Sequence, residues 1–224
     1  NFQGRLVYRM KSIYIMAGGP IETVGELRQY EEPSLWVGAD KGISTLISLG
    51  VFPDIVFGDF DSINKEDLEK IKSKNVEIFQ FPEEKDDTDL GLALEWALSQ
   101  NPELIRIFGN TGGRMDHTMA GVQLLVSPKT LDSNVHVEII DQVNCLYAVR
   151  PGVYQVEKKP LFKYISFIPI APEVKGITLK GFKYPLENKN IKMGTNLCVS
   201  NELISQIGHF SFTSGILLVV RSKD

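Results

Sequence analysis

Aspartates gather at the points where short apolar runs end. Four of them follow such a run within a few residues or open an apolar helical stretch: Asp40, Asp59, Asp61 and Asp89. Carboxylates held close together repel one another and any anion, unless a divalent cation lies between them. Hard oxygen ligands of this kind suit Mg²⁺. The chain is therefore predicted to hold Mg²⁺ and, through it, a polyphosphate.

The segment Gly-Asp-Phe-Asp-Ser at residues 58–62 directly follows an apolar run. In extended backbone, residues i and i+2 point to the same side, so Asp59 and Asp61 are expected to present their carboxylates together while Phe60 turns inward. Such a pair can share or bridge a metal ion. The alternative is that Asp61 or the serine after it only caps a helix that begins near Asn64.

A second acidic run, Asp-Asp-Thr-Asp at residues 86–89, precedes the clearest helical pattern of the chain. Free N–H groups at the start of a helix favour anions. At most one of these acids is needed to cap the helix, and Asp87 is predicted to have that role. Asp89 is then a candidate metal ligand, and the neighbouring Lys85 a candidate phosphate contact.

A glycine-rich segment, residues 109–117, joins an apolar run to a further helical stretch. Its glycines would let backbone amides approach a ligand closely, and the planar guanidinium of Arg114 suits phosphate oxygens. The segment is not a P-loop, because the Gly-Lys-Ser/Thr ending is missing. In the alternative interpretation, Asp116 caps the helix and Arg114 points into solvent.

The elements that must position these residues alternate between strand and helix in the first half of the chain, which is typical of a parallel α/β sheet. The predicted strands are Ile13–Ala17, Leu35–Ala39, Ile55–Gly58, Val76–Phe81, Leu104–Phe108 and Val135–Ile140, and the predicted helices are Ile43–Leu49, Asn64–Lys72, Leu90–Leu98 and His117–Val126. Their near-continuous apolar character indicates a sheet covered on both faces. Ligands of such sheets bind beyond the carboxyl ends of the strands, where the aspartates are expected.

The second half has a different pattern, with short alternating runs between turns rich in Gly, Pro and Asn. Strands are predicted at Val153–Val156, Tyr164–Ile170, Gly176–Lys180, Asn196–Val199, Phe210–Phe212 and Ile216–Val220. We therefore expect an α/β domain over residues 1–143 and a small antiparallel β-sandwich over residues 144–224. Because about 80 residues form only a marginal core, the sandwich is expected to lean on the first domain or on a second copy of itself.

Composition excludes several classes of function. Among 224 residues there are 24 Lys and Arg against 28 Asp and Glu, a net charge of −4 without a basic block, so a nucleic-acid partner is not expected. No run approaches the roughly 20 apolar residues that span a bilayer, and the expected location is the cytoplasm. Cys145 and Cys198 lack the spacing of a zinc site or a disulfide framework and are predicted to be buried thiols.

Taken in order, the motifs resemble those of the thiamine pyrophosphokinase family. They are Gly38-Ala39-Asp40, Pro53-Asp54 leading to Gly58-Asp59-Phe60-Asp61-Ser62, Lys85-Asp86 with Thr88-Asp89, Gly112-Gly113-Arg114-Met115-Asp116-His117-Thr118, Lys180-Gly181-Phe182-Lys183-Tyr184-Pro185-Leu186 and Ser200-Asn201-Glu202. Together they cover almost the whole chain and both predicted halves.

The resemblance implies an N-terminal α/β nucleotide-binding domain, a C-terminal β-sandwich and a homodimer with thiamine near the subunit boundary. It also implies the reaction, in which ATP and thiamine give thiamine diphosphate and AMP. The four aspartates named first would serve Mg²⁺ and the polyphosphate, with Thr88 assisting there. Asp116 would help to hold thiamine, and Ser200 and Asn201 would belong to the pocket of the vitamin.

The sequence departs from the family pattern at several positions. Lys41 stands where glycine is common, and Gly121 stands where Asn is common. Some members stack thiamine against a tryptophan of the C-terminal domain, but both tryptophans of this chain lie in the first half. Three aromatic residues could take that place: Tyr184, Phe210 and Phe212.

Two other functions are compatible with the same residues. A Mg²⁺-dependent phosphohydrolase would use water as the acceptor and release AMP without thiamine. A sensor of thiamine or nucleotide would bind without turnover, although it has less need of several metal ligands.

Overall fold

The protein is described from a computed structural model, in which residues 10–58, 60–61, 63–80 and 87–224 are described. The chain divides into two compact units. The first comprises the residues up to Gly121 together with Ser133–Val137, and the second comprises Val122–Asp132 with Glu138–Asp224. Each unit has its own sheet arrangement and is treated separately here.

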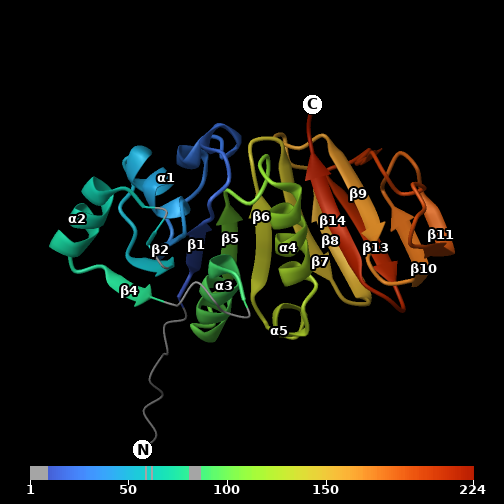
Figure 1. The fold of residues 1–224 in the computed structure, drawn as a ribbon. Coiled ribbons are helices and arrows are strands. Elements are labelled where there is room, and N and C mark those ends of the chain that lie inside the picture. Colours follow the sequence, from blue (N-terminus) through green and yellow to red (C-terminus); the bar gives the residue numbers. More distant parts are fainter. Residues whose placement is uncertain (1–9, 59, 62, 81–86) are drawn as a thin grey trace, which may run out of the picture. The chain divides into compact units, whose positions relative to one another are not determined.

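The first unit contains a parallel sheet with the strand order β5-β1-β2-β3-β4 (Figure 1). Its strands are β1 (Ser12–Met16), β2 (Leu35–Ala39), β3 (Ile55–Gly58), β4 (Glu77–Gln80) and β5 (Leu104–Phe108). Every residue of β1 and β3 is buried, as the near-continuous apolar runs predicted. The predicted parallel sheet is confirmed.

Helices cover both faces of this sheet. The helical elements are α1 (Gly42–Ser48), α2 (Lys65–Ser73), α3 (Asp89–Ser99) and α4 (Met115–Leu125), with short 3₁₀ turns η1 (Ile21–Thr23) and η2 (Leu27–Gln29). On one face Ile43 of α1 and Ile71 of α2 join a buried cluster with Val56 of β3. Side chains alternate along a strand, so Phe57 points to the other face, where its ring centroid lies 6.1 Å from that of Trp96 on α3.

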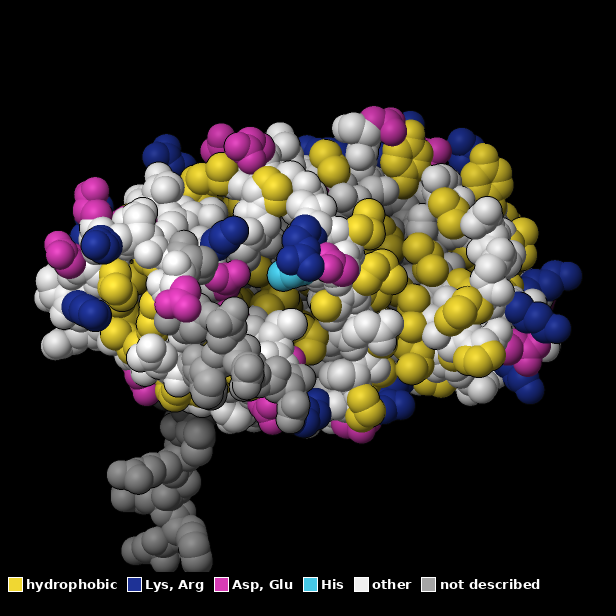
Figure 2. Space-filling model, viewed as in Figure 1, with side chains coloured by type: hydrophobic (Ala, Val, Ile, Leu, Met, Phe, Trp, Pro, Cys, Tyr) yellow, Lys and Arg dark blue, Asp and Glu magenta, His cyan; other side chains and the backbone are white. Residues whose placement is uncertain are grey.

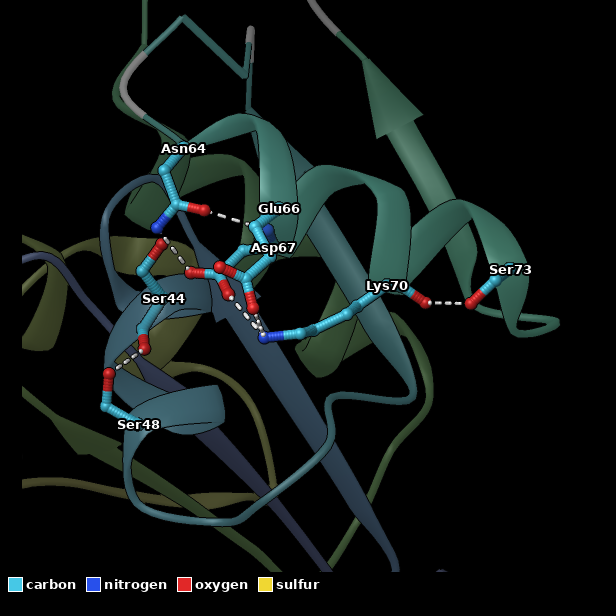
Figure 3. A network of polar contacts seen from close by, with 7 residues as sticks. All are labelled: Ser44, Ser48, Asn64, Glu66, Asp67, Lys70 and Ser73. Atoms are coloured by element: carbon cyan, nitrogen blue, oxygen red, sulfur yellow. Dashed lines mark hydrogen bonds and ion pairs between the residues drawn. The ribbon is translucent and has the colours of Figure 1, made fainter.

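A reciprocal cap fixes the start of α2 (Figure 3). Asn64 is the N-cap: its Oδ1 accepts the backbone N–H of Asp67 at 2.8 Å, and its Nδ2 donates to the Asp67 carboxylate at 2.8 Å. Lys70 then pairs with Glu66 at 2.8 Å, one helical turn along. Such caps stabilise helix starts by about 1 kcal/mol, and this one anchors the chain just after the turn that contains Asp61.

The second unit is built from antiparallel strands. They are β6 (His136–Ile140), β7 (Asn144–Val149), β8 (Gly152–Glu157), β9 (Tyr164–Pro169), β10 (Glu173–Lys180), β11 (Leu186–Lys192), β12 (Asn201–Glu202), β13 (Ile207–Phe212) and β14 (Leu217–Ser222), preceded by the short helix α5 (Pro128–Leu131). One set of hydrogen-bonded strands, part of a ten-stranded sheet, has the order β12-β9-β14-β7-β6, and a separate four-stranded sheet has the order β11-β10-β13-β8.

The two antiparallel sheets share one core, so the predicted β-sandwich is confirmed. Phe167 and Val219 come from the first sheet, and Leu179, Ile191 and Phe210 come from the second. All five are almost completely buried. Every second side chain along these strands therefore points into the core between the two sheets.

One strand prediction in this unit is wrong. The run Asn196–Val199 lies in turns, where Val199 donates its N–H to the Asn196 carbonyl and Leu197 donates its N–H to the hydroxyl of Thr195. Its apolar side chains Leu197 and Val199 are exposed, so the alternation did not mark a buried face. The strand forms earlier, at β11, whose polar sequence Leu-Glu-Asn-Lys-Asn-Ile-Lys lacked an apolar signal because it is a largely exposed edge strand.

Figure 2 shows Lys and Arg side chains interleaved with Asp and Glu over the face that it displays. Among the described residues, no helix is both long and apolar enough to cross a bilayer.

Candidate active site

The carboxyl ends of the parallel strands meet at one edge of the first unit. In the sheet register, Met16 of β1 stands beside Phe108 of β5 and Gly38 of β2, and Ala39 stands beside Phe57 of β3. The segments that leave this edge are those with the predicted site residues. Parallel sheets place their ligands at this edge.

The Asp89 carboxylate and the backbone of Asp40 both lie close to Gly58. Asp40 donates its backbone N–H to the Phe57 carbonyl at 3.0 Å and has a positive φ of 51°. A methyl group added at Gly58 would lie 3.6 Å from Asp89 Oδ2 and 3.7 Å from the Asp40 backbone nitrogen. Gly58 also has a φ of 154°, which side chains rarely allow. A glycine is thus needed at the point that the Asp89 carboxylate and the Asp40 backbone approach.

Three further glycines bring backbone close to this edge, and the sequence analysis assigned them no role in the site. A Cβ at Gly18 would lie 3.4 Å from Asp40 Oδ2, one at Gly19 would lie 2.4 Å from the Gly109 carbonyl oxygen, and one at Gly42 would lie 1.9 Å from the Met16 carbonyl oxygen. The signal for the first two was available, since a Gly-Gly pair follows the first strand directly.

The geometric argument for segment 58–62 is wrong, although its conclusion about Phe60 holds. The extended strand ends at Gly58, and Phe60 has a φ of 66°, so the alternation of extended backbone does not apply there. Phe60 nevertheless packs inward against the cluster around Val56. Asp61 is exposed in the turn that follows. Asp59 and Ser62 lie outside the described residues.

Helix capping does not account for Asp61 or Asp89. The N-cap of α2 is Asn64, so the alternative interpretation of Asp61 as a cap is excluded. The N-cap of α3 is Thr88, whose hydroxyl accepts the Gly91 N–H at 3.0 Å, and the prediction that Asp87 is the cap is wrong. The Asp87 carboxylate instead accepts the N–H of Thr88 at 2.8 Å.

Asp89 is the first residue of α3, where an anionic side chain interacts favourably with the helix N-terminus. It is partly buried, and it approaches Gly58 as described above. The neighbouring Lys85 and Asp86 lie outside the described residues.

Arg114 and Asp116 bind each other at the start of α4. Arg114 donates from Nη2 to Asp116 Oδ2 at 2.5 Å and from Nε to Oδ1 at 3.1 Å, a two-point pairing. The hydrogen bond from Arg114 is the main cause that lowers the pKa of the Asp116 carboxyl, and the N–H of His117 also contributes. Both side chains are exposed, so solvent screens the pair and it contributes little to stability. Arg114 therefore does not point freely into solvent, but meets a carboxylate two residues along.

The residues at this edge suit a hard divalent cation. Mg²⁺ typically takes one or two protein carboxylates and completes its shell with water and substrate phosphates. Asp89 supplies a carboxylate oxygen beside Gly58, and the Asp40 carboxylate lies beside Gly18 at the same edge. Within the described residues, which do not include Asp59, no group of three or more His, Cys, Asp or Glu side chains is placed to hold a metal ion.

In the second unit, Ser200 and Asn201 have very different surroundings. Ser200 is exposed, has a φ of 59°, and donates its N–H to the Ser166 hydroxyl at 2.9 Å. Asn201 is only 2% exposed. Its Oδ1 accepts the N–H groups of Tyr184 at 3.0 Å and Glu202 at 2.9 Å, and its Nδ2 donates to the Tyr184 carbonyl at 2.9 Å. The buried amide thus binds both the N–H and the carbonyl of Tyr184.

The three candidate aromatic residues differ in how far their side chains are buried. Phe210 and Phe212 lie in the sandwich core, with exposed fractions of 1% and 3%. Tyr184 is 57% exposed. Of these three, Tyr184 is the aromatic ring that a ligand can reach.

Two protein-family models match this chain. A family model described as the thiamin pyrophosphokinase catalytic domain matches residues 27–139, and one described as the thiamin pyrophosphokinase vitamin B1 binding domain matches residues 153–217. The thiamine pyrophosphokinase of Bacillus subtilis (strain 168) is 46% identical over 216 residues, which cover 96% of this chain and all of that protein. The chain belongs to the thiamine pyrophosphokinase family.

Further members of the thiamine pyrophosphokinase family agree with this assignment. A solved crystal structure of the Bacillus subtilis enzyme superposes with a TM-score of 0.89 at 45% identity, covering 96% of this chain and 100% of that one. A more distant relative, thiamin pyrophosphokinase 1 of Caenorhabditis elegans, is 29% identical over 84% of this chain and 79% of its own length. The resemblance predicted from the motifs is confirmed. The match to the catalytic domain contains every predicted site residue of the first unit, and the match to the vitamin B1 binding domain contains Ser200 and Asn201.

Proposed function

We propose that this enzyme transfers the diphosphoryl group of ATP to the hydroxyl of thiamine, giving thiamine diphosphate and AMP. The observation that carries the proposal is the match to both family domains over nearly the full chain, together with the positions of Asp40 and Asp89 at the carboxyl edge of the parallel sheet. Chemically, the thiamine hydroxyl would attack the β-phosphorus in line with the departing AMP oxygen.

Asp40, Asp59, Asp61 and Asp89 are proposed to bind Mg²⁺ together with the ATP polyphosphate. The ion would neutralise the charge on the phosphate oxygens and so allow an acidic edge to accept a nucleotide. Asp59, Asp61 and Asp89 are also the proposed catalytic carboxylates. Asp61 or Asp89 could accept the hydroxyl proton of thiamine, because a phosphoryl-transfer transition state needs only a weak base.

Two other residues are proposed to contact the phosphates. Lys85 would do so through its ammonium group. Thr88 is suited to the same role, since its oxygen accepts the Gly91 N–H while its own proton remains available to donate.

Arg114 and Asp116 are proposed to lie between phosphate and vitamin. Asp116 is ionised at neutral pH, and the hydrogen bond from Arg114 lowers the pKa of its carboxyl further. An ionised carboxylate suits thiamine, which carries a permanent positive charge. The guanidinium of Arg114 can bind Asp116 and still offer N–H groups to a phosphate oxygen.

Ser200, Asn201 and Tyr184 are proposed to form the vitamin pocket of the second unit. Ser200 is exposed and could contact thiamine directly. Asn201 has its amide engaged by backbone, so its proposed role is to position Tyr184. The exposed ring of Tyr184 would supply the aromatic contact that a tryptophan supplies in some members of the family.

We also propose that the enzyme works as a homodimer in the cytoplasm. Large apolar side chains are exposed on the second unit near the proposed vitamin pocket: Tyr184, Met193, Leu197, Val199 and Ile204. Exposed apolar surface of this kind favours contact with another protein surface. Both cysteines are free and buried, which suits a reducing compartment. Analytical ultracentrifugation at several concentrations would test the dimer.

The reaction is tested by measuring AMP and thiamine diphosphate with ATP and Mg²⁺, in the presence and absence of thiamine. The proposal requires the two products to appear in equal amounts and only when thiamine is added. Release of AMP at the same rate without thiamine would instead identify a nucleotide phosphohydrolase. Binding of thiamine without any product would identify a sensor.

A further inference from the structure

Asn110 ties the loop after β5 to helix α4. It directly follows the Gly109 turn and is only 7% exposed. Its backbone carbonyl accepts the Thr118 hydroxyl at 2.9 Å, and its Nδ2 donates to the Thr118 carbonyl at 3.4 Å. Two contacts therefore connect the strand side of the loop with the second turn of the helix.

The Asn110 amide lies on the Cα of Gly121, one turn further along α4. A Cβ built at Gly121 would lie 2.4 Å from Nδ2, 2.5 Å from Oδ1 and 2.6 Å from Cγ of Asn110. Glycine within a helix is less favourable than alanine, so its presence here needs a packing reason. That reason is the amide of Asn110, which occupies the volume that a side chain at position 121 would take.

The loop between these contacts leads to Arg114 and Asp116. Its other side is held by Thr23, whose hydroxyl donates to the Thr111 carbonyl at 3.1 Å. Gly112 has a φ of 81°, and a Cβ there would lie 2.2 Å from Thr23 Cγ2. The loop is thus fixed by Thr23 on one side and by Asn110 on the other.

We propose that Asn110 and Gly121 form a reciprocal pair, in which the Asn110 amide fills, from the strand side, the volume that a side chain at position 121 would occupy. Asn110 is then a positioning residue: it sets the loop against α4 and thereby orients the Arg114–Asp116 pair. The inference rests on the proposed function, because it assigns Asp116 to the thiamine site.

The test is an exchange of the two residues. The variants are Asn110→Ala, Gly121→Asn and the double variant, each compared with the parent in thiamine KM, ATP KM, kcat and melting temperature. Gly50→Asn is the matched control, because a Cβ at Gly50 has no atom within 4 Å and Asn tolerates the φ of 75° found there.

Each single change is expected to impair the thiamine site. Gly121→Asn forces two amides into one volume, and we expect kcat/KM for thiamine to fall about tenfold or more, as small misplacements of positioning groups do. Asn110→Ala is expected to raise the KM for thiamine more than the KM for ATP. The double variant, with one amide in the shared volume again, is expected to recover both activity and melting temperature, in a strongly non-additive way.

Two outcomes would overturn the proposal. If the losses of the single variants simply multiply in the double variant, the residues do not form a reciprocal pair. If melting temperatures recover but Asn110→Ala leaves the KM for thiamine unchanged, the pair has no positioning role. Should the parent not transfer a diphosphoryl group at all, the proposed function fails, yet the non-additivity of the melting temperatures still tests the pairing itself.

Discussion

Replacing Asn201 with alanine should destabilise the second unit and loosen the proposed vitamin pocket. The buried amide makes three hydrogen bonds to backbone, two with Tyr184 and one with Glu202. At a net value of about 0.5–1.5 kcal/mol for each bond, the loss comes to about 3 kcal/mol. Some of the backbone N–H and carbonyl groups would be left unpaired in a partly buried site, which lowers the free energy of unfolding further.

The assay is urea unfolding followed by far-UV circular dichroism, with Asn190→Ala as the matched control. Asn190 accepts one exposed backbone N–H, that of Gly176 at 3.0 Å, so its loss should cost about 1 kcal/mol or less. In the same preparation, Asn201→Ala should raise the KM for thiamine more than the KM for ATP, because Tyr184 loses its support. A decrease in unfolding free energy no larger than that of the control would refute this reasoning.

Three other outcomes are expected. Asp61→Asn should lower kcat by about 100-fold or more, the scale found when one charge-stabilising group is removed. As the control, Asp132→Asn changes an exposed carboxylate of the second unit and should leave kcat unchanged. Near-normal turnover of Asp61→Asn would exclude the proposed role of Asp61. Gly18→Ala places a methyl group 3.2 Å from Lys41 Cβ and 3.4 Å from Asp40 Oδ2. The tight contact with Lys41 should shift the segment that contains Asp40 and lower kcat/KM for ATP by about three- to tenfold, since small displacements of positioning groups are costly. An unchanged value would show that the position of Asp40 does not depend on this space. Burial raises the pKa of Cys198 from 9.0 to about 11. The stability that its neutral thiol contributes is therefore complete below pH 9 and is lost as the pH rises towards 11. At pH 8 the thiol of the native protein should resist iodoacetamide and should react in urea; rapid labelling of the native protein would contradict the burial of Cys198.

Much of the first unit could be predicted because its signals are local. The runs that became β2, β3 and β5 have the predicted bounds, since most of their residues are buried and apolar, with Arg106 of β5 as the charged exception. The positions of Asp40 and Asp89 at the same edge followed from the rule that parallel strands end at one edge. Chain order and strand type were sufficient for that conclusion.

What failed depended on contacts between side chains and backbone. Several acids precede α3, but a hydroxyl satisfies its first turn equally well, and only the geometry shows that Thr88 has that role. The positive φ of Phe60 breaks the extended backbone that the predicted alternation of side chains requires, and nothing in the sequence predicts a positive φ at a phenylalanine. Strand β11 is an exposed edge with polar residues, so its pairing with β10 had no apolar signal in the sequence.

The role of Asn110 was also beyond sequence reasoning. Gly121 was noticed as a departure from the family, but the residue that fills its space lies eleven positions earlier in the chain. Only packing between the loop and α4 connects the two positions.

The central claim is that the acidic edge of the parallel sheet accepts a nucleotide only through a divalent cation. Isothermal titration of a non-hydrolysable ATP analogue tests it most directly, with Mg²⁺ and then with EDTA, in the parent and in Asp89→Asn. The account predicts tight binding with Mg²⁺, loss of binding in EDTA, and weakened Mg²⁺-dependent binding in the variant. Equal affinity with and without the cation would contradict it.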